Sequence, residues 1–173
     1  DVLIFPQQKS AISRDERKTL LAVWHLDGNR VTRLGSDLDE RCQLIGNWRY
    51  AIENISSPYP WGKMFGRRYH DLYAIDVASG TRVKIRDRVR HSWGSTGGRY
   101  VLWFDGKSYW THDLQTGKKV EITRGIATDF ANTFYDTPTD LLPPHGVGGW
   151  LDDDAAVLLY DRFDVWRVAP DGG

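Results

Sequence analysis

Two patterns recur along this chain at fixed spacings, and they constrain its fold more than any other feature. The segments 76–80 and 113–117 share the order Asp, apolar, any residue, Ser or Thr, Gly, and begin 37 positions apart, reading DVASG and DLQTG. Each follows an aromatic segment and precedes one in which apolar and polar residues alternate. Such self-similarity is typical of repeat architectures.

Aromatic residues form a second, independent register. Trp93 and Trp150 each stand ten residues before another aromatic residue, Trp103 and Tyr160, and a further Trp follows seven and six residues later, at 110 and 166. Two matched spacings in succession indicate that the same unit is repeated.

The unit consists of short β-type runs bounded by turn residues. Asp outnumbers Glu 19 to 4 and there are 17 Gly, which favours turns over helix interiors. The clearest predicted strands are residues 2–5, 19–26, 30–34, 50–55, 71–77, 81–85, 100–104, 108–113, 118–123, 155–160 and 164–168. Four antiparallel strands per repeat are typical of a β-propeller blade.

We therefore expect an all-β fold, a partial β-propeller of about four blades that are each a four-stranded antiparallel meander. Residues 1–173 form one propeller segment, and the predicted blades are about 1–40, 41–89, 90–126 and an incomplete 146–173, with an inter-blade loop at 127–145. Because the last blade stops before its closing strand and the chain has no initial Met, we expect a piece of a longer protein.

Charge and composition exclude several classes of function. The chain has 23 basic and 23 acidic side chains, so nucleic acid is not an expected partner. Its apolar runs are too short for membrane insertion, and no signal peptide is visible. With one Cys, Cys42, and five scattered His, we expect neither a metal site nor any other cofactor.

Four segments resemble catalytic or cation-binding motifs but lack the required context. The segment 90–94 (RHSWG), around Ser92, lacks the helix that follows a nucleophile elbow, and 145–149 (HGVGG) leads into the repeated Trp150 instead of an oxyanion loop. Residues 105–108 (DGKS) are predicted to be a hairpin turn and not a phosphate loop. The Asp run 152–154 is predicted to be a solvated turn.

A cationic segment stands out in an otherwise neutral chain. Cationic residues occupy every second position from 82 to 90, and in an extended strand such positions lie on one face. The sequence therefore predicts one face that carries five cations, Arg82, Lys84, Arg86, Arg88 and Arg90. This face is either an outer blade strand that charge protects from edge pairing, or a docking face for an acidic partner domain or ligand.

Two segments depart from the repeat. Residues 56–70 interrupt the second predicted blade, and residues 125–149 separate the third from the fourth. Loops this long usually have a function or a docking partner. The candidates for contact with a substrate or a domain are Tyr59, Trp61, Phe65 and Tyr69. Packing on a neighbouring blade or domain is the alternative, and carbohydrate binding is a third.

Residues 98–118 resemble a blade of the propellers of the prolyl oligopeptidase family, and the resemblance is clearer in residues 134–150 and 161–166. These last two ranges are similar to bacterial acylaminoacyl or dipeptidyl peptidases. The resemblance covers roughly residues 71–173, while the first 70 residues resemble a generic blade. Periplasmic TolB-like proteins contain related blade sequences.

The resemblance implies a non-catalytic region of a serine peptidase. Its partners would be the α/β-hydrolase domain of the same parent chain and a peptide substrate, and its role would be to restrict access to the catalytic triad. No triad residue can be assigned here, and the chain has no Glu-Glu pair of the kind that dipeptidyl peptidase IV relatives use. A periplasmic or secreted location is favoured over a cytoplasmic one. The alternative is a stand-alone TolB-like propeller that acts as a protein-interaction module.

Overall fold

The computed structural model describes residue 12 and residues 16–65 and 67–173, and it is an all-β protein with four antiparallel sheets. The strand predicted at residues 2–5 lies outside the described residues. In the part of the chain that is described, no helix has the length and apolar character needed to cross a membrane.

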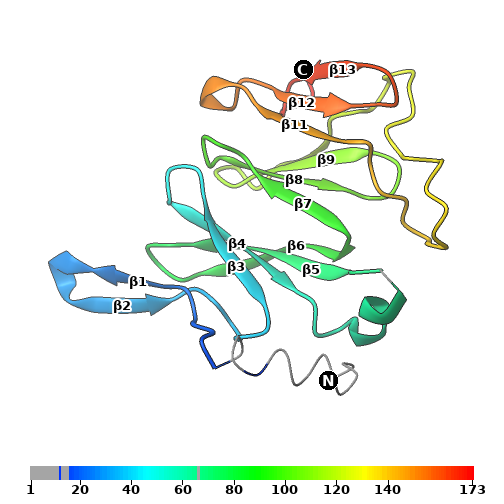
Figure 1. The fold of residues 1–173 in the computed structure, drawn as a ribbon. Helices are drawn as coiled ribbons and strands as arrows, with labels where there is room; N and C mark the ends of the chain where they lie inside the picture. Colours follow the sequence, from blue (N-terminus) through cyan, green and yellow to red (C-terminus); the bar gives the residue numbers. More distant parts are fainter. Residues whose placement is uncertain (1–11, 13–15, 66) are drawn as a thin grey trace.

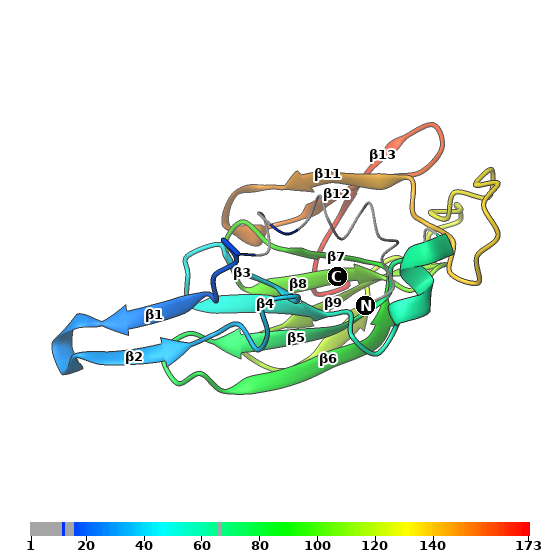
Figure 2. The same cartoon turned by 60° about the horizontal axis from the view of Figure 1, so that its bottom comes forward.

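The strands of each sheet follow one another along the chain, so each sheet is a meander (Figure 1). Two sheets have four strands, one has three and one has two. Figures 1 and 2 show the sheets stacked along the molecule, with the hairpin β1–β2 projecting from one end. The first sheet contains β1 (Ala22–His25) and β2 (Arg30–Arg33); the second β3 (Arg41–Ile45), β4 (Tyr50–Ile55), β5 (His70–Asp76) and β6 (Arg82–Val89); the third β7 (His91–Gly94), β8 (Tyr100–Phe104), β9 (Tyr109–Asp113) and β10 (Lys119–Glu121); the fourth β11 (Gly146–Trp150), β12 (Val157–Tyr160) and β13 (Val165–Val168). In the described part of the chain, three short 3-10 helices each connect two strands of the same sheet: η1 (Leu26–Gly28), η2 (Pro60–Phe65) and η3 (Asp152–Asp154).

The repeated Asp-to-Gly segments are hairpin turns with the same hydrogen bonds. Asp76 Oδ1 accepts the Ser79 N–H at 2.8 Å, and Asp113 Oδ1 accepts the equivalent Thr116 N–H at 3.3 Å. In both turns the glycine N–H donates to the carbonyl of the Asp at 2.8 Å. Gly80 and Gly117 follow with φ of 76° and 75°, a left-handed conformation that glycine adopts at little cost. The sequence pattern therefore records a turn that closes the second and the third sheet in the same way.

The repeated spacing of aromatic residues reflects a side-chain hydrogen bond across a different hairpin. Asp105 Oδ2 accepts the Trp110 indole N–H at 2.7 Å, and Asp161 Oδ2 accepts that of Trp166 at 2.7 Å. The other oxygen of each carboxylate binds backbone N–H groups of its own turn. Residues 105–108 thus form the predicted hairpin turn, and the spacing of Trp110 and Trp166 is set by this contact.

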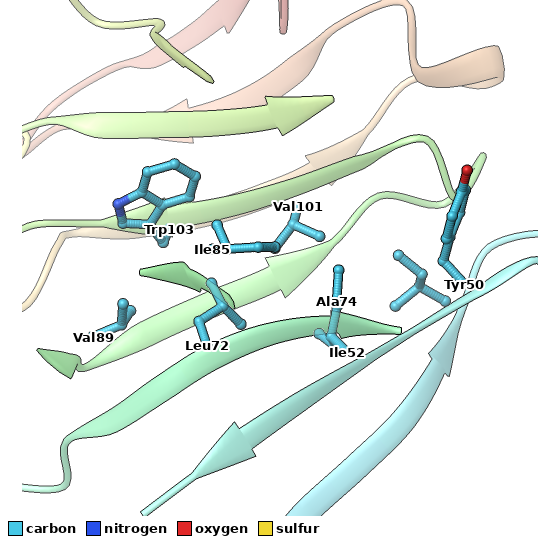
Figure 3. Packing of buried hydrophobic residues seen from close by; sticks show 9 residues of the cluster. Tyr50, Ile52, Leu72, Ala74, Ile85, Val89, Val101 and Trp103 are labelled. Atoms are coloured by element: carbon cyan, nitrogen blue, oxygen red, sulfur yellow. The ribbon is translucent and has the colours of Figure 1, made fainter. Parts of the chain in front are cut away.

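Apolar side chains join the second and third sheets (Figure 3). Strand β8 is buried over its whole length: Val101 and Trp103 face the second sheet, while Leu102 and Phe104 face the fourth. Burial of apolar surface yields about 25 cal/mol per Å², so each interface contributes to holding the stack together. The cluster between the second and third sheets consists of Ile45, Tyr50, Ile52, Leu72, Ala74, Ile85, Val89, Val101 and Trp103.

A buried carboxylate joins the third and fourth sheets. Asp154 is 4% exposed, and its oxygens accept the Ser95 hydroxyl at 2.6 Å, the Gly97 N–H at 2.7 Å and the Arg99 N–H at 3.1 Å. A Cβ at Gly97 would come within 2.7 Å of this carboxylate, so the turn requires glycine. These three hydrogen bonds are called the Asp154 clamp. The prediction of a solvated turn is wrong for Asp154, because a turn of the neighbouring sheet covers it.

Replacing Asp154 by Ala should lower the free energy of unfolding by about 2–4 kcal/mol, because the buried Ser95 hydroxyl and two partly buried backbone N–H groups lose their acceptor. Urea denaturation measures this loss. Asp152→Ala is the matched control, since Asp152 lies in the same short helix and is exposed. An equal loss in both variants would contradict the clamp.

Candidate functional site

The two segments that depart from the repeat meet along one side of the stack of sheets. Figures 1 and 2 show η2 and the loop before β11 on the same side of the molecule. Arg67 Nε donates to the Pro138 carbonyl at 2.7 Å, and the Tyr69 hydroxyl donates to Asp140 Oδ1 at 2.5 Å. These two irregular loops, which are separated along the chain by strands β5 to β10, therefore form one surface, which we call the loop cluster.

Arg88 lies at the centre of the loop cluster. It has φ of 51°, which turns the end of β6 away from a regular strand. Its guanidinium lies 4.7 Å from the centre of the Tyr69 ring and pairs with Asp140. Hydrogen bonds from Tyr69 and Arg88 lower the pKa of Asp140 to about 2, so Asp140 is a carboxylate at neutral pH.

Arg90 holds the same loop at a second point. Its guanidinium donates to the Tyr135 hydroxyl at 2.7 Å and to the Leu141 carbonyl at 3.1 Å, and it lies 4.8 Å from the centre of the Tyr135 ring. The hydrogen bond from Arg90 lowers the pKa of Tyr135. Arg88 and Arg90 together bind the loop before β11 to the end of β6.

Asp71 fixes the base of the 56–70 insertion. It accepts the Tyr59 hydroxyl at 2.6 Å and the Arg88 N–H at 3.1 Å, and it pairs with Lys84 at 2.8 Å. Burial raises the pKa of Asp71, but the hydrogen bonds from Lys84 and Tyr59 outweigh it, so the pKa is lowered overall. The charged carboxylate therefore anchors both the insertion and the strand end.

A groove of about 400 Å³ opens on the insertion side of the cluster. The Tyr59 and Tyr69 rings meet edge to face, with centres 6.1 Å apart. Trp61 is 68% exposed at the groove, and η2 ends at Phe65, whose side chain lies outside the described part of the structure. The groove is lined by Pro58, Tyr59, Pro60, Trp61, Gly62, Arg67, Tyr69 and Arg88.

The prediction that five cations share one face is wrong. Lys84 stands opposite Tyr73, but Arg86 stands opposite Leu72, because the register shifts between these pairs. Consecutive residues of a strand face opposite sides, so Lys84 and Arg86 lie on opposite faces of the sheet. The bulge and the left-handed Arg88 distribute the five cations over two faces and one corner.

The cations also have partners within the chain. Arg82 pairs at 2.7 Å with Glu53, whose side chain is fully buried, and donates to the Leu34 carbonyl at 2.7 Å. Lys84, Arg88 and Arg90 bind the carboxylates, the hydroxyl and the carbonyl described above. The side chain of Arg86 makes no ion pair or hydrogen bond with another described residue. Docking of β6 to an acidic partner stays a prediction, and Arg86 is the cation available for it.

Ser92 lies within strand β7, in regular pairing with β8, as the missing motif context predicted. Its hydroxyl is 3.1 Å from His70 Nε2 and donates to Asn54 Oδ1 at 3.4 Å. Burial, and after it repulsion by His91, lower the pKa of His70 to about 4. Such an imidazole is a weak base at neutral pH, so this Ser-His contact has little nucleophilic character.

The comparisons with known proteins give no family. No model of a protein family matches the chain, and no curated protein matches it. Sequence reasoning named Tyr59, Trp61, Tyr69 and the cations, but it missed Asp71, Tyr135 and Asp140. Tyr135 and Asp140 lie in the predicted inter-blade loop, and the length of that loop was the signal that could have found them.

Replacing Arg82 by Met should lower the free energy of unfolding by roughly 3–5 kcal/mol, because it leaves the buried Glu53 carboxylate without its cation. Thermal or urea denaturation tests this expectation. Arg86→Met on the same strand is the control and should leave stability nearly unchanged. Similar losses in the two variants would contradict the assigned role of Arg82.

Stability should also fall in mild acid because of His70 and His91. Burial is the main cause that lowers the pKa of each from 6.5 to about 4. The unfolded chain therefore binds protons first, so this contribution is complete above pH 6.5, decreases as the pH falls, and levels off below about 4. Urea denaturation at a series of pH values should show a flatter dependence for the double variant His70→Gln/His91→Gln. Identical pH profiles for the two proteins would show that His70 and His91 do not cause the loss of stability in mild acid.

Proposed function

We propose that this chain is a β-propeller segment that serves as the non-catalytic region of a prolyl-oligopeptidase-like serine peptidase. The fold supports the propeller: successive meanders stack face to face, and the second and third sheets end in the same Asp-to-Gly turn. The resemblance of residues 98–118, 134–150 and 161–166 supports the peptidase family.

The observation that carries the proposed role is the loop cluster. Arg88, Arg90 and Asp71 hold the two long loops together along one side of the stack. Such a fixed side presents one shaped surface to a neighbouring domain or to a peptide, and binding to a preorganised surface costs less conformational entropy. In the proposed protein this side contacts the α/β-hydrolase domain or the incoming peptide.

The proposed mechanism is steric. The hydrolase domain of the parent chain supplies the nucleophile, and the stacked sheets exclude folded proteins from it. Short peptides pass because they require neither unfolding nor the ordering of a long chain. The chain itself contributes walls and contacts and takes no part in bond cleavage. A periplasmic or secreted location fits the family resemblance.

The native protein that contains this chain tests the proposal. A fluorophosphonate probe should label a serine outside residues 1–173, within a G-x-S-x-G elbow between a strand and a helix. The labelled protein should cleave a short unstructured peptide and leave intact a folded protein that carries the same sequence in a loop.

Two outcomes would refute parts of this proposal. If the native protein has no such elbow and is not labelled, the peptidase function is wrong and the TolB-like interaction module takes its place. If it is labelled but cleaves the folded protein as fast as the short peptide, the steric mechanism is wrong.

A further inference from the structure

We propose that the groove beside η2 binds a neutral, proline-rich segment of a partner protein in the polyproline II conformation. We call it the Trp61 groove. The ligand is a docking segment and not a substrate for cleavage. The inference goes beyond the proposed function, because it holds whether or not a peptidase domain accompanies this chain.

Exposure of Trp61 is the first argument. The side chain is 68% exposed in a groove whose other walls include two Pro and two Tyr. Folding leaves most of this apolar surface in water, so a partner that covers Trp61 would gain the free energy of burying it. An exposed aromatic residue within an apolar groove marks an interaction surface.

The groove is also held in shape. The Tyr59 hydroxyl donates to Asp71 at 2.6 Å and the Tyr69 hydroxyl to Asp140 at 2.5 Å, which fixes both rings edge to face. The Arg67 N–H donates to the Gly62 carbonyl at 2.8 Å and closes the loop that carries Trp61. A ligand therefore meets aromatic walls that need little reordering.

The cations that line the groove already have partners within the chain, so an acidic ligand would have to displace them. Arg67 donates to the Pro138 carbonyl, and Arg88 pairs with Asp140. Both Tyr hydroxyls are also committed to carboxylates, which leaves few polar groups for the hydroxyls of a sugar. Acidic peptides and carbohydrates are accordingly disfavoured as ligands.

One donor is available for a peptide backbone. No acceptor among the described residues binds the indole N–H of Trp61. A polyproline II segment has no internal hydrogen bonds and presents its carbonyl groups outward, while its rings pack on aromatic side chains. Trp61 can donate to such a carbonyl while Tyr59 and Tyr69 contact the proline rings.

The residues of the groove already bind a proline-containing segment of the same chain. Arg67, Tyr69 and Arg88 line the groove and also bind the Pro138–Asp140 part of the loop before β11. In that contact Arg67 donates to the carbonyl of a proline. A proline-rich partner in the groove would extend an interface that the protein already makes with itself.

The test is binding of fluorescein-labelled decaproline to the complete 173-residue chain, followed by fluorescence anisotropy. We expect saturable binding that changes little between low and high salt. Trp61→Ala should weaken it at least about tenfold, as expected of a central aromatic contact. Trp61→Phe, which keeps a ring but removes the N–H, should give an intermediate loss. Trp48→Ala is the matched control, since Trp48 is 72% exposed and lies in the β3–β4 turn.

Three outcomes would overturn the proposal: no binding by the unmodified chain, equal losses in Trp61→Ala and Trp48→Ala, or preferential binding of polyglutamate or maltohexaose. Circular dichroism of each variant checks folding, which we expect to be unchanged because both positions are exposed. Decaproline binding is measured independently of serine labelling in the native protein. A negative result for the groove therefore leaves the peptidase proposal untouched, and the reverse also holds.

Discussion

A sheet that is apolar on both faces is stable only when another layer covers each face, and this constraint organises the molecule. In β8, Val101 and Trp103 pack on the second sheet while Leu102 and Phe104 pack toward the fourth. The second sheet is likewise buried on two sides, through Leu72 on one and Ile75 on the other. Each sheet therefore depends on its neighbours, and the stack extends along the chain as a repeat architecture does.

Polar groups decide how the sheets are aligned within this stack. Apolar burial is not directional, whereas a buried carboxylate requires donors at defined positions. The Asp154 clamp sets the fourth sheet against a turn of the third, and Glu53 holds Arg82 beside the first. Asp71 performs a similar task at the opposite end of β5 from the turn at Asp76. The aspartates that composition associated with turns thus also connect sheets and loops.

Electrostatic neutralisation shapes the candidate site. The cations at the end of β6 suggested an acidic ligand, but Arg88 and Arg90 are used to attach the loop before β11. Within the groove, Arg88 is paired with Asp140, and the indole N–H of Trp61 has no acceptor among the residues that the structure describes. The irregular loops are therefore fixed to the scaffold by residues that the sequence offered for a partner, and the groove presents mainly aromatic side chains for recognition.

The sequence by itself determined the local features: the all-β class, the two repeated turns, the Asp and Trp pairs across hairpins, and the strand nature of the segment around Ser92. Each depends on residues fewer than about ten positions apart, so spacing reveals it. Tertiary structure decided the rest. Strand β3 (Arg41–Ile45) was not among the predicted strands, because its pattern is weak and its pairing with β4 defines it. The bulge in β6 separated cations that a period of two had placed together, and no pattern reports one inserted residue. Burial of Asp154 and the meeting of Tyr69 with Asp140 join residues more than 50 positions apart, which only the folded chain brings within hydrogen-bonding distance.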